Sequence, residues 1–210
     1  MSTPRQVYLD NNATTMCAPE VVEAMRVHWS DRYGNPSSMH SFGGEVRREV
    51  DHARGQVAQL LGAQPSEIVF TSGGSESDNL AIRGTLEALG GRKRHVVTTR
   101  VEHPAVRGLC HHLQKQGYRL TDLPVDGDGA LDLEQLAQAI TPDTALVSVM
   151  WANNETGVVF PIEQIAQLCR ARRVALHTDA VQVAGKLPID VGQVPVDLLS
   201  ISGHKLHGPK

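Results

Sequence analysis

The stretch from which the fold can be inferred is Ser202-Gly203-His204-Lys205-Leu206-His207-Gly208-Pro209-Lys210, which follows the apolar run 196–201. The apolar run reads as a buried strand. A lysine at the end of a buried strand, shielded from water, loses its proton more readily and can form a Schiff base with an aldehyde. A solvated lysine in a Gly/Pro turn is the more common situation. A second feature of the chain is therefore needed to favour the reactive lysine.

The second feature is His177-Thr178-Asp179-Ala180-Val181-Gln182, which follows the apolar run 174–176. A single aspartate after a strand is usually a turn or cap residue. Here, however, an aspartate and a lysine each end one of two successive apolar strands. Pyridoxal phosphate (PLP) needs both groups, because a lysine holds its aldehyde and a carboxylate keeps its pyridine nitrogen protonated. The pair predicts a PLP site.

A phosphate site is expected at Ser72-Gly73-Gly74-Ser75-Glu76-Ser77, between a predicted strand at 67–71 and a predicted helix at 76–89. Glycines let backbone N–H groups approach an anion, and a helix N-terminus adds a favourable dipole. Ser75 can donate its hydroxyl. The alternative is an ordinary helix N-cap made by Ser75 or Ser77. The loop matches neither of the common nucleotide-binding glycine motifs.

Strands and helices alternate along the chain, which predicts an α/β fold with a mainly parallel sheet covered by helices on both faces. We expect one domain over 1–210, with a helical segment at 1–65 and the sheet region at 66–210. Two helices are predicted in the first segment, at 18–31 and 44–62. In the second, strands are predicted at 67–71, 95–99, 119–123, 145–151, 174–178 and 196–201, and helices at 76–89, 104–117, 132–140 and 161–172.

Composition excludes several classes of protein. The net charge of −3 gives no reason to expect a nucleic-acid partner. No apolar stretch approaches the ~20 residues of a membrane helix, and residues 1–6 lack the apolar core of a signal peptide. The three cysteines have no metal-ligand spacing, and the pair His111-His112 is expected to be solvated, so no metal is predicted. A cytoplasmic protein is expected.

Seven segments resemble the cysteine desulfurases, class V members of the fold-type I PLP enzymes. They occur in the family's order over essentially the whole chain. The resemblance implies the large domain of a PLP-dependent transferase. The segments are Tyr8–Thr15, Gly34–Ser38, Thr71–Asn79, Glu102–Val106, Asn153–Gly157, His177–Gln182 and Ser202–Lys210.

The resemblance also implies roles for single residues. Lys205 is expected to be the Schiff-base lysine and the base that moves the substrate's α-proton, and Asp179 the partner of the pyridine nitrogen. Gln182 would hydrogen-bond the cofactor's phenolic oxygen. His103 would stack on the ring and assist proton transfer, although it could instead cap the helix that Pro104 begins.

Other matched residues are expected to bind the phosphate and the substrate. Asn154 would contact both the cofactor and the substrate carboxylate. The phosphate group is expected to lie against Gly74, Ser75, Ser202, Gly203 and His204.

The activity that the resemblance implies is conversion of L-cysteine to L-alanine, with sulfur passed to a cysteine persulfide for iron–sulfur cluster assembly. The segment Trp151-Ala152-Asn153-Asn154 is most similar to the nitrogen-fixation branch of the family. A homodimer and an iron–sulfur scaffold protein as sulfur acceptor are implied as partners. A selenocysteine lyase, another class V PLP enzyme and a non-catalytic fragment stay open as alternatives.

Two features of the family have no match. In the family, the cysteine that accepts sulfur lies well beyond the PLP lysine, whereas this chain ends five residues after Lys205. Cys17, Cys110 and Cys169 lie in other contexts, and free cysteines are mostly buried small hydrophobes. The small C-terminal domain and the antiparallel strand expected beside 67–71 are also missing. We therefore expect a fold that is incomplete at its C-terminus and a truncated chain without desulfurase activity.

Overall fold

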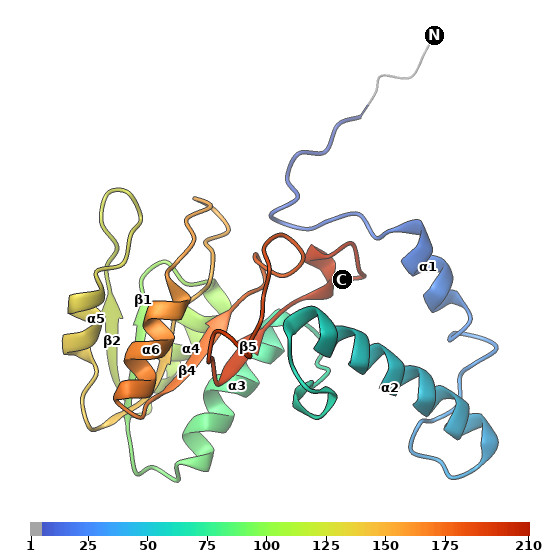
Figure 1. The fold of residues 1–210 in the computed structure, drawn as a ribbon, viewed down its shortest axis with the longest axis horizontal. Helices are drawn as coiled ribbons and strands as arrows, with labels where there is room; N and C mark the ends of the chain where they lie inside the picture. The colour runs from blue at the N-terminus through green and yellow to red at the C-terminus, as the bar shows by residue number, and fades with distance from the viewer. Residues whose placement is uncertain (1–5) are drawn as a thin grey trace.

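The structure, a computed structural model, describes residues 6–210. Figure 1 shows a sheet with helices packed around it and, to one side, the two helices nearest the N-terminus. Most of residues 1–6, where no signal peptide is predicted, lies outside the described part. No helix within residues 6–210 is both long and apolar enough to cross a membrane.

The sheet has five parallel strands in the order β2-β1-β3-β4-β5. Asp179 pairs with Ser200 in the register of β4 with β5. The turn that follows β5 therefore returns to the edge of the sheet where Asp179 lies. The strands are β1 (His95–Thr99), β2 (Arg119–Leu123), β3 (Thr144–Ser148), β4 (Ala175–Asp179) and β5 (Leu198–Ser200).

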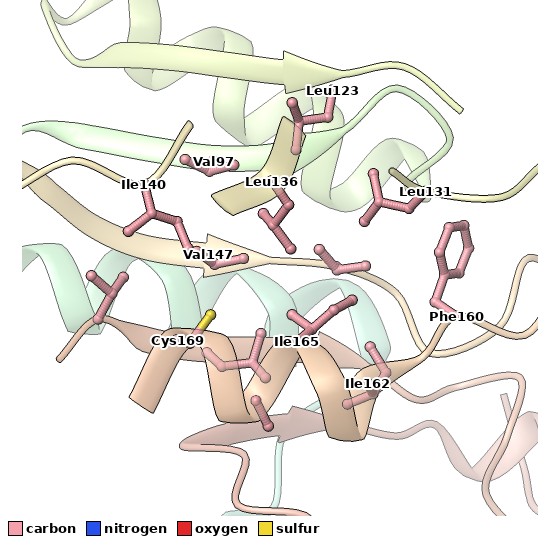
Figure 2. Packing of buried hydrophobic residues seen from close by; sticks show 14 of the residues in the cluster. Val97, Leu123, Leu131, Leu136, Ile140, Val147, Phe160, Ile162, Ile165 and Cys169 are labelled. Atoms are coloured by element: carbon pink, nitrogen blue, oxygen red, sulfur yellow. The ribbon is translucent and has the colours of Figure 1, made fainter. Parts of the chain in front are cut away.

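Helices cover both faces of the sheet, as the alternation of elements predicts. Helices α3 (Gly74–Ala88) and α4 (Pro104–Lys115) pack on the face that includes Val96. Helices α5 (Leu133–Ala139) and α6 (Ile162–Ala171) pack on the face that includes Val97. Neighbouring strand residues point to opposite faces of the sheet, so Val96 and Val97 are buried in two separate hydrophobic cores. Figure 2 shows side chains of α5 and α6 meeting those of the strands.

Two helices precede the sheet region. Helix α1 (Pro19–Arg26) buries none of its residues, and α2 (Ser41–Leu61) buries Ala58 and Leu61 near its C-terminal end. Leu61 packs with apolar side chains of the segment that follows β4. Gly62 is the C-cap of α2, and its φ of 67° suits glycine because glycine has no Cβ.

The predicted strand at 67–71 is wrong. Residues Pro65–Glu67 form a 3₁₀ turn, and the segment that follows pairs with no strand in the described chain. Val69 and Phe70 are 68% and 49% exposed. The guanidinium of Arg54 donates to the Ile68 carbonyl and lies 4.8 Å from the Phe70 ring centroid. β-branched and aromatic residues favour an extended backbone, but a strand also requires a neighbour to pair with.

Candidate functional site

A cavity of about 310 Å³ opens at the carboxyl edge of the sheet. Such crevices are the usual ligand sites of parallel α/β sheets. Every predicted site residue except Gly203 lines it, although these residues come from segments far apart in the sequence. The lining residues are Asn12, Ala13, Gly74, Ser75, Asp78, His103, Met150, Asn154, Glu155, Asp179, Val181, Gln182, Ser202, His204 and Lys205.

Lys205 ends the 3₁₀ turn Gly203–Lys205 that follows β5. Its Nζ donates to the carbonyl oxygen of Ala13 at 2.9 Å and to that of Asn12. Burial lowers the pKa of Lys205, and the Lys186 ammonium lowers it further, while Asp10 and Asp179 oppose this shift. The neutral, nucleophilic amine is therefore more accessible than in an isolated lysine.

Asp179 is the last residue of β4 and is 5% exposed. Its Oδ1 accepts from the Val181 backbone N–H at 2.9 Å, so the aspartate is also the turn residue that its position suggests. Burial raises the pKa of Asp179, and the Val181 hydrogen bond, His103 and Lys205 act in the opposite direction. A cation placed against this carboxyl would be held strongly, because water does not screen it there.

The glycine-rich loop leads directly into α3. Gly73 is the N-cap and no side chain caps the helix, so the alternative of a Ser75 or Ser77 cap is wrong. Ser77 instead shares a hydrogen bond with the Thr71 hydroxyl at 2.7 Å. A Cβ on Gly74 would lie 3.3 Å from Val181 Cγ2, so the backbone at Gly74 packs closely against the Val181 side chain. Ser75 and the N-terminus of α3 are left facing the cavity.

His103 caps α4, because its Nδ1 accepts from the Ala105 N–H at 3.2 Å. The capping interpretation is therefore confirmed. The same residue also lines the cavity. Stacking of its ring on a cofactor stays a prediction.

The N-terminal segment is part of the site, and reasoning from single residues missed it. Gln182 Nε2 donates to the Asn12 carbonyl at 2.9 Å, and His204 Nδ1 lies 3.1 Å from Thr14 Oγ1. Asn12 Nδ2 donates to the Asn154 carbonyl at 3.3 Å. The only available signal was the match of Tyr8–Thr15 to the family, which assigned these residues no role.

Three buried polar residues were also missed, and one of them, Asp78, lines the cavity. Asp78 is 1% exposed, and burial together with Asp179 raises its pKa to about 7. His177 lies between the hydroxyls of Ser148, at 2.9 Å, and Ser200, at 3.0 Å. Burial lowers the pKa of His177 to about 4. Glu102 is also buried and has a pKa raised to about 8 by burial.

No cysteine is among the residues that line this cavity in the described chain. Cys110 and Cys169 are buried in helices, and burial raises the pKa of each thiol to about 12. Cys17 is half-buried and lines a separate cavity of about 530 Å³. Buried neutral thiols are poor nucleophiles. Within residues 6–210, no three His, Cys, Asp or Glu side chains group together as metal ligands.

Comparison with known proteins relates the chain to enzymes. The family model described as "Aminotransferase class-V" matches residues 7–210. A cysteine desulfurase of Trichormus azollae is 56% identical over 204 residues, covering 97% of this chain and 51% of that protein. Cysteine desulfurase NifS of Azotobacter vinelandii is 54% identical over 205 residues, covering 97% of this chain and 51% of that protein. The chain spans about half the length of the curated relatives it matches.

Solved structures confirm the predicted α/β fold. One described as "NIFS-LIKE PROTEIN" has a TM-score of 0.95 at 41% identity, covering 98% of this chain and 57% of its own. Another, "SspA in complex with cysteine", has a TM-score of 0.94 at 41% identity, covering 97% of this chain and 58% of its own. The sheet and its helices are therefore similar to part of each of those larger structures.

Proposed function

Because the chain belongs to the class V aminotransferase family, we propose that it forms the cofactor-binding region of a PLP-dependent cysteine desulfurase. The observation that supports this most directly is the single cavity that contains both Lys205 and Asp179. These two side chains are the groups that PLP requires, and they are 26 positions apart in the sequence (205 − 179). The identity to curated cysteine desulfurases supports the choice within the family.

The cavity residues are suited to the cofactor. The lowered pKa of Lys205 makes its amine available to an aldehyde. The buried Asp179 carboxyl is the acceptor for a protonated ring nitrogen. Ser75 lies in the first turn of α3, where an anionic phosphate is favoured, and Ser202 and His204 supply further polar groups to the same cavity. Gly74 and Gly203 keep the backbone there free of side chains, and Gly203 lies next to the cavity rather than in its lining.

In this proposal each remaining residue has a definite task. PLP supplies an electron sink for bonds at the α-carbon of an amino acid. Lys205 holds the group and moves the α-proton, and His103 covers the ring and assists that transfer. Gln182 donates to the phenolic oxygen. Asn154 orients the substrate carboxylate.

The proposed substrate is L-cysteine, and the products are L-alanine and sulfur bound to a cysteine thiolate as a persulfide. An iron–sulfur scaffold protein is the proposed sulfur acceptor, and a cytoplasmic homodimer the proposed working form. The similar solved structure of SspA in complex with cysteine supports the substrate. We propose that residues 1–210 form one PLP-binding large domain.

The proposal is tested by titrating the purified chain with PLP and recording its absorbance and visible circular dichroism. We expect a Schiff-base band that saturates with PLP and is absent in Lys205→Met. Lys115→Met, which changes an exposed lysine at the end of α4, is the matched control and should keep the band. An identical band in Lys205→Met would overturn the assignment of the lysine.

A further inference from the structure

Glu102 lies in the turn between β1 and α4, directly before His103. Its side chain turns inward, and the residue is 4% exposed. Its Oε1 accepts from the Thr99 hydroxyl at 2.7 Å and from the Met150 backbone N–H at 2.9 Å. The carboxyl therefore ties the end of β1 to the segment that follows β3.

This tie joins two walls of the cavity. His103 belongs to the first turn, and Met150 and Asn154 belong to the second, and all three line the cavity. A further hydrogen bond runs between the same two turns, from Asn153 Nδ2 to the Val101 carbonyl at 3.0 Å. The two turns that carry His103 and Asn154 are thus joined by the hydrogen bonds of Glu102 and of Asn153.

The surroundings of Glu102 indicate a neutral carboxylic acid. Its Oε2 is buried and has no hydrogen-bond partner in the described chain. Burial raises the pKa of Glu102 to about 8 against the hydrogen bonds from the Met150 N–H and the Thr99 hydroxyl, which lower it. The carboxyls of Asp179 from β4 and Asp78 from α3 add smaller contributions that raise it. Glu102 also helps to raise the pKa of the Cys110 thiol of α4. No ion pair joins Glu102 to a lysine, arginine or histidine within residues 6–210.

We propose that Glu102 is a positioning residue that, as a neutral acid, holds His103 and Met150 at the walls of the Lys205 cavity. Glu102 itself does not line the cavity, so it acts through His103 and Met150, which do. The role in catalysis rests on the proposed PLP function. The protonation state and the positioning of His103 can be tested without any cofactor.

The first measurement is the thermal unfolding midpoint between pH 5 and 9 for the wild-type chain and Glu102→Gln. The folded pKa of Glu102 lies above its ordinary value of 4.5. Its contribution to stability is therefore present at low pH and is lost as pH rises toward 8. Glutamine keeps the shape and carries no titrating proton. We expect Glu102→Gln to gain stability relative to wild type as pH rises across this range.

The matched control is Glu134→Gln, which changes an exposed glutamate of α5. Its curve should run parallel to that of the wild type. If the unfolding midpoint of Glu102→Gln also followed that of the wild type across the pH range, the proposal that Glu102 is a neutral acid would be overturned.

The second measurement follows the His103 ring by NMR in the chain without PLP, with the resonances assigned by their loss in His103→Gln. We expect Glu102→Gln to leave them unchanged and Glu102→Ala to shift them. Because His103 is the next residue in the chain, the comparison of Glu102→Gln with Glu102→Ala is what isolates the hydrogen bonds that the side-chain oxygen accepts. Unchanged His103 resonances in a folded Glu102→Ala chain would overturn the positioning role. If Glu102→Ala does not fold, Glu102→Leu takes its place, with the same outcomes.

The third measurement is PLP affinity at pH 7. We expect Glu102→Gln to bind within about twofold of wild type. Glu102→Ala should bind roughly tenfold more weakly, the equivalent of one lost buried hydrogen bond. Equal affinities for the alanine variant and wild type would contradict a role in the cofactor site. If the wild type itself binds no PLP, the proposed function fails, while the first two measurements still decide the state and role of Glu102.

Discussion

At the scale of single residues, Thr15 fixes the Lys205 turn against the N-terminal segment. Its N–H and its hydroxyl both donate to the His204 carbonyl, at 2.9 and 2.8 Å, and its Oγ1 accepts from the His207 N–H at 2.9 Å. We expect Thr15→Val, which removes the hydroxyl and keeps the shape, to lower the free energy of unfolding by about 1–3 kcal/mol. Urea denaturation measures this change. Thr15→Ser should recover most of the loss, and equal losses in both variants would contradict the hydrogen-bonding explanation.

His177 makes the stability of the fold depend on pH in the acidic range. Its folded pKa of about 4 lies below the ordinary 6.5. The unfolded chain therefore gains a proton that the folded chain resists, and stability is lost as pH falls from about 6.5 to about 4. Asp78 Oδ1 is 3.5 Å from the ring, but its own raised pKa leaves it uncharged in this range.

We expect His177→Gln to lose less stability than wild type when pH falls from 7 to 5, as measured by thermal unfolding. His112→Gln, which changes an exposed histidine of α4, serves as the control and should follow the wild type. An acid-induced loss as large in His177→Gln as in wild type would contradict the assignment to this ring.

Single site residues could be predicted from the sequence where the cofactor's chemistry requires one particular type of side chain. A lysine and an aspartate after two successive strands predicted one site, and the structure places both in one cavity. Asp78 and Glu102 carry no comparable signal, because a carboxylate on a helix or in a turn is usually solvated. What sets them apart is burial against strands that lie far away in the sequence, which only the folded arrangement determines.

At the scale of elements, α6 is held to the sheet by an apolar face. Ile165 is completely buried in that face, whereas Leu80 of α3 is 51% exposed. We expect Ile165→Ala to lower the free energy of unfolding by about 2–5 kcal/mol, through lost burial and the cavity left behind. Leu80→Ala should change it by less than about 1 kcal/mol. Urea denaturation of the two variants makes the comparison, and similar costs would contradict the packing described for α6.

The segment 67–71 shows the limit of prediction from local pattern. Its residue types are those of a strand, and the helices and other strands predicted in the same way are present with shifts of a few residues at their ends. A strand, however, depends on a partner, and Val69 and Phe70 remain exposed. Amphipathic helices and buried strands could be predicted because their own sequence shows which side faces the core. Local pattern does not show which distant segments pair, and it was the family resemblance that predicted a missing neighbour for 67–71.

At the scale of the whole molecule, the thiols limit what this chain can do. Transfer of sulfur requires a thiolate positioned to accept it, and Cys110 and Cys169 are buried with pKa values of about 12. We expect the purified 210-residue chain to bind PLP without releasing alanine or sulfide from L-cysteine. Stoichiometric or greater release of alanine, lost in Lys205→Ala, would contradict this expectation and would point to Cys17 as the acceptor.

The central claim is that Lys205 is the residue that holds PLP. The most direct measurement is to incubate the chain with PLP, reduce it with borohydride, digest it and locate the pyridoxyl label by mass spectrometry. We expect the label on the peptide that contains Lys205, at about one per chain, and a label that is lost in Lys205→Ala. A label on Lys186 or Lys210 with none on Lys205 would contradict the account.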